Sequence, residues 1–263
     1  MSSAGSSHSK EDSLSTVEKD NKDNKVSSVK LHGEGDEFII LGNQKFYRHE
    51  LMSAFGGSLN PGLAPYPVHK LGNPSPLGLA AFSMTTFVLS MYNAQAMGIQ
   101  IPNVVVGLAC FYGGAVQFLA GVYEFLVSNT FGATALTSYG AFWVSYAAIN
   151  IENFGIVSAY GDDETQLENA IGFFLLAWGM FTFMLFLVTM KSTVAFALLF
   201  FSLFLTFILL AGGAFSGKVG VTRAGGVVGV ITAFIGFYNA FAGVANSGNS
   251  YITVRPFFLT KQD

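Results

Sequence analysis

The sequence predicts an all-α integral membrane protein with six transmembrane helices. The first observation is composition: of 263 residues, 51% are hydrophobic and only 11% are charged, whereas about a quarter of the residues in an ordinary soluble domain carry charge. The second is the segregation of charge, since no Asp, Glu, Lys or Arg occurs between Leu71 and Tyr123. Together these observations exclude an ordinary soluble domain.

The N-terminal residues 1–37 are expected to form a disordered cytosolic tail. They mix Ser, Lys, Asp and Glu, and no Phe, Tyr or Trp occurs before Phe38. Such a segment buries too little apolar surface to offset the entropy of ordering. No apolar run follows Met1, so a cleavable secretory signal is not expected. Residues 38–72 place apolar side chains among Gly, Pro and basic residues, and we expect a cytosolic collar at the membrane surface.

Residues 73–250 are expected to form the transmembrane transport domain. A spanning helix needs about 20 mainly apolar residues, and the seven prolines of the chain fall at or outside the ends of such stretches, where a missing N–H does no harm. The predicted helices cover residues 76–93, 103–126, 132–150, 166–190, 192–215 and 223–246.

The basic residues that flank these helices set the expected orientation. Lys70, Lys191 and Lys261 would lie on one side of the membrane, and by the positive-inside rule this side is the cytosol. Lys218 and Arg223 would lie on the other side and count against this assignment. We therefore expect both termini in the cytosol, with residues 251–263 as a cytosolic C-terminal tail.

Small and polar residues recur at helical spacing in two of the predicted helices. Such stripes let helices approach closely within lipid, so each is expected to face other helices. In the last helix plain packing is the favoured interpretation, whereas the second helix also places Gln117 and Glu124 on its stripe. The two stripes are Gly107, Cys110, Gly114, Gln117, Gly121 and Glu124, and Gly225, Gly229, Ala233, Gly236, Ala240, Gly243 and Ser247.

The first, third and fifth predicted helices begin on the same side of the membrane near a residue that can cap a helix. Counting nine, ten and eleven residues inward from Asn73, Asn129 and Ser192 gives a depth of about 14–16 Å, the middle of a hydrocarbon core roughly 30 Å thick. Bulky side chains at one depth could close a path, although spacing leaves open whether they face one. The residues at that depth are Phe82, Tyr139 and Leu203.

The first helix begins with NPSPLGL, in which Asn73 and Ser75 each precede a proline. Either polar side chain can cap the helix, and proline suits its first position. A helix N-terminus attracts anions, so this start could face a substrate carboxylate. The alternative is a simple signal for helix initiation, and physical reasoning alone favours this alternative.

Four longer motifs resemble the acetate uptake transporter family, which includes fungal acetate permeases, also called ammonia-export proteins, and bacterial succinate–acetate permeases. They are NPSPLGL at 73–79, FYGGAVQFLAGVYE at 111–124, NTFGATALTSYGAFW at 129–143 and AWGMFT at 177–182. The resemblance covers about residues 38–250, and the long N-terminal tail suggests a fungal source. Two positions depart from the commonest family pattern: Ser75 replaces Ala, and Tyr123 replaces a frequent Trp.

The resemblance implies six transmembrane helices per protomer, a hexamer, and a substrate path through each protomer. It places Phe82, Tyr139 and Leu203 at the hydrophobic constriction of the family, in agreement with the depth count. The residues expected to line the substrate path are Asn73, Ser75, Asn129, Thr130 and Gln117.

The chemistry of the membrane domain points to transport rather than catalysis. It holds no His and a single Cys, so metal, haem and thiol chemistry lack ligands, and no phosphate-binding loop is present. We therefore expect no enzyme activity, no metal and no cofactor. Glu124 is the only carboxylate in its helix; the candidate roles are proton coupling and a structural hydrogen bond to the start of the next helix.

The resulting functional prediction is a multi-pass plasma-membrane transporter of acetate and related short monocarboxylates, with protons or as the undissociated acid. Its expected partners are acetate and other small carboxylates, protons, the lipid bilayer and further copies of the chain, and no nucleic acid. The alternatives are an ammonium or small-anion channel and a nutrient-sensing membrane receptor.

Overall fold

The computed structural model describes residues 30–32, 37–41, 44–54, 71–254 and 256–260. The chain divides into two compact units, residues 1–70 and 71–263, and each is described by itself. Most of the predicted N-terminal tail and residues 55–70 of the predicted collar lie outside the described residues.

The described part of the first unit is a three-stranded antiparallel sheet followed by a short helix. The strands are β1 (Lys30–His32), β2 (Phe38–Leu41) and β3 (Gln44–Tyr47), in the order β1-β2-β3, and the helix is α2 (Arg48–Ala54). Phe38 pairs with Tyr47 across β2 and β3, and their ring centroids are 4.8 Å apart. The ammonium of Lys45 lies 3.7 Å from the centroid of the Phe38 ring, so the sheet is held by cross-strand and cation–π contacts.

This sheet is a finding that the sequence analysis did not anticipate. Residues 30–32 were expected to belong to a disordered tail, yet they form β1, and residues 38–47 of the predicted collar form β2 and β3. The chain is therefore mostly helical rather than all-α. Periodicity failed here because the strands are three or four residues long, too short for a clear alternation of apolar and polar side chains.

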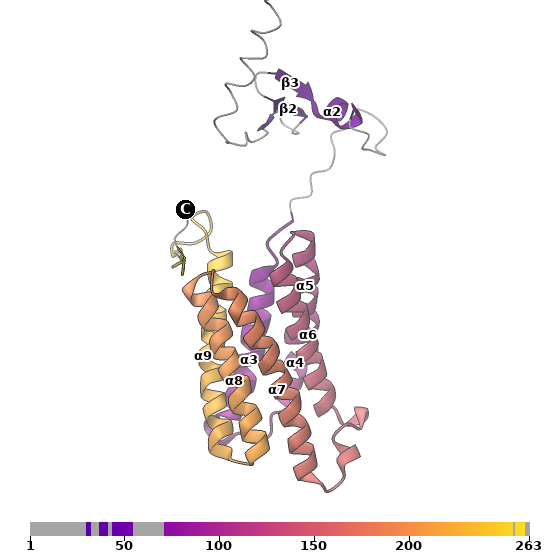
Figure 1. Ribbon diagram of the computed structural model, residues 1–263, viewed down its shortest axis with the longest axis vertical. Coiled ribbons are helices and arrows are strands. Elements are labelled where there is room, and N and C mark those ends of the chain that lie inside the picture. Colours follow the sequence, from indigo (N-terminus) through magenta and orange to yellow (C-terminus); the bar gives the residue numbers. More distant parts are fainter. Residues whose placement is uncertain (1–29, 33–36, 42–43, 55–70, 255, 261–263) are drawn as a thin grey trace, which may run out of the picture. The chain divides into compact units, whose positions relative to one another are not determined.

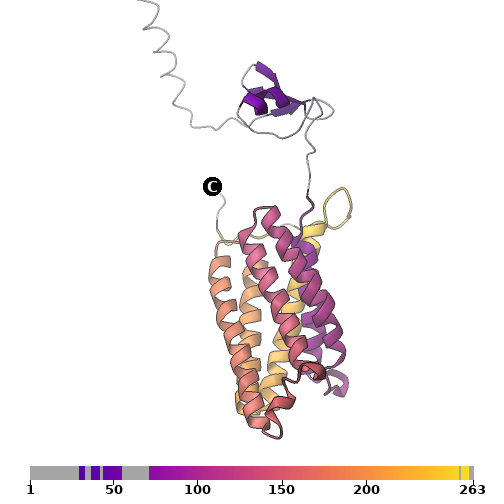
Figure 2. The ribbon, with the colours of Figure 1, turned by 90° about the vertical axis from the view of Figure 1, so that its right-hand side faces the viewer.

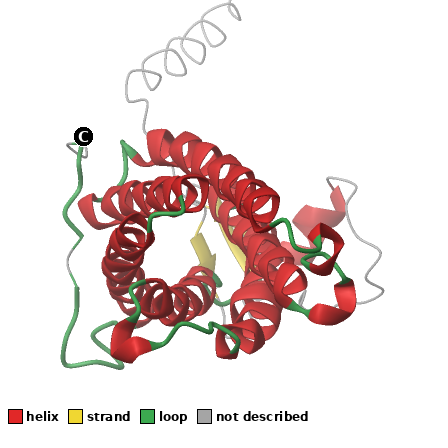
Figure 3. Ribbon diagram, turned by 90° about the horizontal axis from the view of Figure 1, so that it is seen from below, coloured by secondary structure: helices red, strands yellow, loops and turns green. Residues whose placement is uncertain are grey.

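The second unit is a bundle of long helices (Figures 1 and 2). Seen along the helices, they lie side by side around a common centre (Figure 3). Neighbouring pairs with extensive contact are α3 with α9, α5 with α6, α7 with α8, and α8 with α9. The elements are α3 (Ser75–Asn93), η2 (Ala96–Gly98), α4 (Val104–Cys110), η3 (Phe111–Val116), α5 (Gln117–Leu126), α6 (Thr130–Asn150), η4 (Glu152–Phe154), η5 (Ser158–Tyr160), α7 (Glu164–Thr189), α8 (Val194–Ser216) and α9 (Val219–Val244).

Within the described residues, four helices are long and apolar enough to cross a membrane. Helices α3 and α6 fall outside this set because they carry more Ser, Thr, Asn and Tyr. In α3 several of these polar side chains are buried inside the bundle, among them Ser83, Thr85, Thr86 and Ser90. The four apolar helices are Val104–Leu126, Glu164–Thr189, Val194–Ser216 and Val219–Val244.

The bundle has an upper and a lower end in the view of Figure 1. The upper end contains the starts of α3, α6 and α8, and the lower end contains the points where these three helices finish. At the upper end, Asn129 Oδ1 accepts a hydrogen bond from Gly132 N at 3.0 Å, and Thr193 Oγ1 accepts from Phe196 N at 3.3 Å. These are the side-chain caps that stabilise the first turn of a helix.

The start of α3 differs from both, because α3 begins at Ser75 and Pro76 occupies its second position. Asn73 Oδ1 accepts from Ser75 N at 3.1 Å, which closes a local turn just before the helix. The hydroxyl of Ser75 does not cap its own helix and instead donates to Glu124.

Helices α4, η3 and α5 are parts of one continuous helix that contains a π-helical turn at Phe111–Val116. A π turn holds one extra residue, so the faces before and after it are out of phase. The predicted stripe is correct within and after the turn: Gly114 in the turn and Gln117, Gly121 and Glu124 after it are all buried. It is wrong before the turn, where Gly107 is exposed and the buried residues are Val105 and Ala109.

The small face of α9 packs against α3 and α8 from Gly225 to Gly243, as predicted for this helix, but Ser247 lies beyond the end of α9 and is exposed. A Cβ placed on Gly236 would lie 3.3 Å from the Cβ of Ser83, and one placed on Gly229 would lie 3.0 Å from the Cβ of Ser90. Glycine is required at these positions because the two helices approach closely.

The C-terminal segment returns to the upper end and pairs with the start of α8. Val194 N donates to Phe257 O at 2.8 Å, and Leu259 N donates to Ser192 O at 3.0 Å. Val194 is the first residue of α8, so the C-terminal segment satisfies a backbone N–H that the helix itself leaves free.

Candidate functional site

The described part of the bundle contains a lower and an upper cavity. The lower cavity has a volume of about 400 Å³ and is bordered by the ends of α3 and α6, including Asn93 and Asn150. The upper cavity has a volume of about 180 Å³ and is bordered by the starts of α3 and α6, including Ser75 and Asn129. The two cavities therefore occupy opposite ends of the bundle.

Phe82, Tyr139 and Leu203 are the residues that line both cavities. They come from α3, α6 and α8, and all three are buried. The ring centroids of Phe82 and Tyr139 are 5.9 Å apart. The three residues selected by the depth count thus lie together, at the boundary between the upper and lower cavities.

The ring of Tyr139 is fixed by α7. Its hydroxyl lies 2.9 Å from Thr182 Oγ1, and Thr182 donates to the carbonyl of Trp178 at 2.7 Å. The Tyr139 ring also contacts the rings of Trp178 and Phe181, with centroids 6.1 Å and 5.7 Å away. Aromatic contacts of this kind restrict the orientation of a buried ring.

The upper cavity is mostly apolar and has three polar residues in its lining: Ser75, Gln117 and Asn129. Gln117 is 0% exposed, and neither its Nε2 nor its Oε1 has a hydrogen-bond partner. Buried polar groups are hydrogen-bonded in the great majority of cases. An unpartnered amide beside a cavity is therefore a position where a ligand or water can bind.

Glu124 is one of the two largest fully buried side chains and, among the described residues, the one buried carboxylate. Its Oε2 accepts from Asn129 Nδ2 at 2.6 Å, and its Oε1 accepts from the hydroxyl of Ser75. A Cβ on Gly132 would lie 2.9 Å from the carboxyl carbon, so the carboxylate is packed against the first turn of α6. Glu124 thereby joins the end of α5 to the starts of α3 and α6.

The structure brings Ser75, Gln117 and Asn129 to the upper cavity but leaves out the other two predicted path residues. Asn73 is exposed and its side chain turns to the backbone of Ser75, and Thr130 is exposed on the first turn of α6. Neither belongs to the lining of the two cavities. The sequence placed them near the path because they flank the correct helix starts, but both are exposed.

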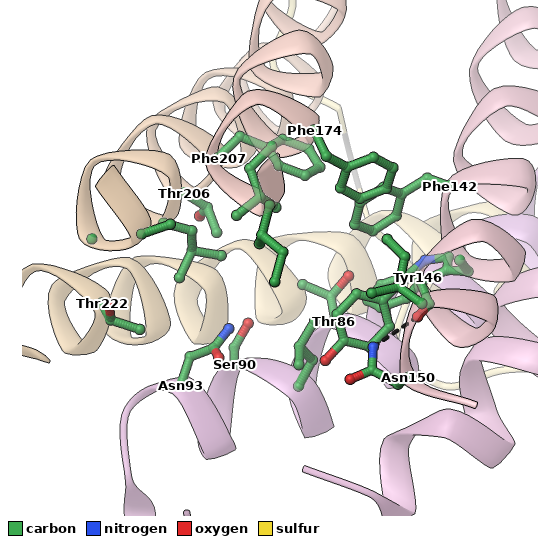
Figure 4. A pocket seen from close by; sticks show the side chains of 18 of the residues that line it. Thr86, Ser90, Asn93, Phe142, Tyr146, Asn150, Phe174, Thr206, Phe207 and Thr222 are labelled. Carbon is green, nitrogen blue, oxygen red and sulfur yellow. Dashed lines mark hydrogen bonds between the residues drawn. The ribbon is translucent and has the colours of Figure 1, made fainter. Parts of the chain in front are cut away.

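The lower cavity contains a polar group of residues that the sequence analysis missed (Figure 4). Thr86, Ser90 and Asn93 follow Phe82 along one face of α3 at steps of four, four and three residues. This helical spacing was a visible signal in the sequence. The hydroxyl of Thr86 and the indole N–H of Trp143 are buried without a partner, and both residues line this cavity together with Tyr146, Asn150, Thr206 and Thr222.

Arg223 lies near the lower cavity and contacts a residue of its lining. Its Nε donates to Gln95 Oε1 at 2.8 Å, and its Nη2 donates to the same oxygen. Gln95 adopts a positive φ of 55°, an uncommon conformation for a residue other than glycine. Arg223 is itself outside the lining, and no Lys or Arg is found among the described residues that line either cavity.

No cluster of three or more His, Cys, Asp and Glu side chains suited to a metal occurs in the part of the chain that the structure describes. The polar groups that line the two cavities are hydroxyls, amides, one indole N–H and, at the lower cavity, the carboxylate of the exposed Glu168. These groups suit weak hydrogen bonding to a small polar solute.

The several apolar helices indicate a multi-pass membrane protein, and the two cavities meet at one layer of side chains. The sequence profile of the GPR1/FUN34/yaaH family matches residues 55–261, and the chain belongs to this family. The resemblance seen in the sequence motifs is thereby confirmed.

Three known proteins illustrate the family. Ammonia transport outward protein 2 of Saccharomyces cerevisiae is 59% identical, covering 90% of this chain and 84% of its own length. Acetate permease A of Emericella nidulans is 44% identical, and the match covers 79% of this chain and 73% of the permease. A solved structure described as the bacterial acetate channel SatP is 34% identical with a TM-score of 0.63, covering 71% of this chain and all of that chain.

Proposed function

We propose that this protein carries acetate and related short-chain monocarboxylates across the plasma membrane, with protons or as the undissociated acid. The observation that carries the proposal is the pair of cavities that meet at Phe82, Tyr139 and Leu203, with the unpartnered amide of Gln117 next to this layer. The names of two relatives, an acetate permease and an acetate channel, support the choice of substrate.

Gln117 is well suited to a passing carboxylic acid. Its Nε2 can donate to a carboxylate oxygen, and its Oε1 can accept from the hydroxyl of an undissociated acid. An unsatisfied buried polar group costs about 1–3 kcal/mol, and a bound acid would relieve this cost. Because the lining contains no Lys or Arg among the described residues, binding is weak enough to allow release, as conduction requires.

Phe82, Tyr139 and Leu203 form the constriction in this proposal. Phe82 and Leu203 are apolar, and the hydroxyl of Tyr139 is paired with Thr182, so this layer offers few hydrogen bonds to a charged solute. An ion that leaves water without new partners is strongly disfavoured. An undissociated acid carries no net charge and crosses such a layer at lower cost. The proton then crosses as part of the acid, or it moves through Glu124, which is the candidate proton carrier because it is the buried carboxylate beside the upper cavity.

The proposal includes six transmembrane helices per protomer, with α3 and α6 added to the four apolar ones, and both termini in the cytosol. At 1.5 Å per residue, α3 and α6 have about the length of a hydrocarbon core. Their polar side chains line the two cavities and so need not contact lipid. A hexamer is proposed from the family resemblance.

Flux in proteoliposomes tests the proposal, with labelled acetate and external pH recorded together. Net acetate uptake with alkalinisation of the external medium supports transport with protons or as the acid. A voltage-driven current without pH change supports a small-anion channel. Absence of acetate flux contradicts the proposal and leaves ammonium movement or a nutrient-sensing receptor.

Ammonium movement is the second candidate function, because a relative 59% identical is named an ammonia transport outward protein. The same vesicles, loaded with labelled methylammonium, separate the two candidates. Methylammonium efflux without acetate flux would favour the second candidate over the first.

A further inference from the structure

We infer that Thr182 on α7 is a positioning residue that sets substrate specificity at the constriction by accepting a hydrogen bond from the hydroxyl of Tyr139 and so holding its ring. The inference rests on the proposed function. Thr182 lines neither cavity in the described part of the chain, so it does not contact a solute in the path and acts through Tyr139.

The direction of the hydrogen bonds follows from the number of available protons. A threonine hydroxyl has one proton, and Thr182 donates it to the carbonyl of Trp178 at 2.7 Å. In its contact with Tyr139, 2.9 Å away, Thr182 can then only accept. The hydroxyl proton of Tyr139 is therefore directed toward α7.

The position of this pair makes the bond strong. Thr182 is 0% exposed and Tyr139 is 3% exposed, so water does not compete for the bond, and a hydrogen bond in a site of low polarity is electrostatically stronger than one in water. The ring contacts of Tyr139 with Trp178 and Phe181 come from the same helix. Helix α7 contributes no residue to the constriction itself, yet it fixes the orientation of one of its three side chains.

Two consequences follow for a solute in the constriction. A fixed Tyr139 ring gives the opening a constant width, so acids larger than acetate meet a rigid wall. The hydroxyl of Tyr139 already donates to Thr182, so it offers no hydrogen bond to a carboxylate anion. An undissociated acid needs no such donor, because its own hydroxyl is protonated. Thr182 thus favours small, neutral acids over larger acids and over anions.

The test uses the full-length protein in proteoliposomes and measures the ratio of acetate flux to lactate flux under one condition. Thr182→Val keeps the volume and removes the hydroxyl, and the acetate-to-lactate ratio is expected to fall about five-fold, the effect of losing one ordinary hydrogen bond. Thr182→Ser retains the hydroxyl and is expected to keep the wild-type ratio. In a Tyr139→Phe background, Thr182→Val is expected to change the ratio no further.

Thr85→Val is the matched control. Thr85 is also 0% exposed, donates to a carbonyl one turn earlier, that of Ala81 at 2.9 Å, and lines neither cavity in the described residues. A purely structural effect of losing a buried threonine hydroxyl would change Thr85→Val and Thr182→Val alike. The inference expects a changed flux ratio in Thr182→Val alone.

A wild-type ratio in assembled Thr182→Val protein overturns the inference and leaves the proposed function intact. If Thr182→Val lowers the acetate-to-lactate ratio by the same factor in the Tyr139→Phe background, the inference is also overturned, because Thr182 then acts independently of Tyr139. If Thr182→Val does not assemble, Tyr139→Phe alone decides, since it breaks the same bond and must lower the ratio. Absence of acetate flux in the wild-type protein contradicts both the inference and the proposed function.

Discussion

Gln117 and Glu124 lie two helical turns apart on one face of α5, and both side chains are 0% exposed. Both oxygens of Glu124 accept hydrogen bonds, from Ser75 and Asn129, whereas neither polar atom of Gln117 has a partner. The same helix face therefore carries a satisfied polar group near the upper end and an unsatisfied one beside the constriction. Hydrogen-bond satisfaction, rather than burial, distinguishes a residue that holds helices together from one that is free to meet a solute.

Removal of the hydrogen-bonded carboxylate of Glu124 should have the largest effect on stability. In Glu124→Ala the Ser75 hydroxyl and the Asn129 amide lose their acceptor, and each buried unsatisfied group costs about 1–3 kcal/mol. We expect a clearly lower melting temperature in detergent and a smaller yield of assembled protein. A wild-type melting temperature would show that Glu124 does not join the three helix ends.

Removal of the unpartnered amide of Gln117 should leave stability unchanged and lower the flux. Gln117→Met keeps the length of the side chain and removes two polar atoms that have no partner, so the melting temperature should stay equal or rise. Acetate flux should fall about ten-fold, since each factor of ten corresponds to 1.4 kcal/mol of lost interaction. Normal flux in folded Gln117→Met protein would contradict the role of this amide in the path.

A smaller change tests one arm of the Glu124 network. Ser75→Ala removes the hydroxyl that donates to Oε1 and leaves the bond from Asn129 in place. We expect a loss of about 1 kcal/mol in the free energy of unfolding, measured by chemical denaturation. A loss as large as that of Glu124→Ala would show that Ser75 alone carries the network.

The smallest effect on stability is expected for Glu124→Gln. The amide oxygen can accept from Asn129, and the amide nitrogen can donate to Ser75, whose hydroxyl can turn to accept. The melting temperature should change little, so flux and external pH can be compared directly with wild type. Intact proton coupling in this variant would exclude Glu124 as the proton carrier and leave it with a structural role.

The sequence predicted much of this arrangement because the relevant signals are periodic. Each predicted long helix coincides with a helix of the structure, and no predicted end differs from an observed end by more than four residues. The depth count selected Phe82, Tyr139 and Leu203 because three helices start at one end of the bundle and residues rise by a constant distance along each helix.

Other features depend on tertiary contacts or on local departures from regular geometry. The π turn at Phe111–Val116 shifts the face of its helix, and no periodic pattern marks such a turn in advance. The hydrogen bonds of Glu124 with Ser75, and of Tyr139 with Thr182, join residues 49 and 43 positions apart. Sequence spacing placed these residues on the correct helices but gave no information on their partners.

The pairing of the C-terminal segment with the start of α8 has a consequence for biosynthesis. Val194 N and Ser192 O bond to Phe257 and Leu259, residues that the ribosome adds more than 60 positions later. During translation α8 therefore enters the membrane with these backbone groups still open to water. They are paired only once residues 257–259 have been made, so a product that stops before these residues would differ at the upper end of the bundle.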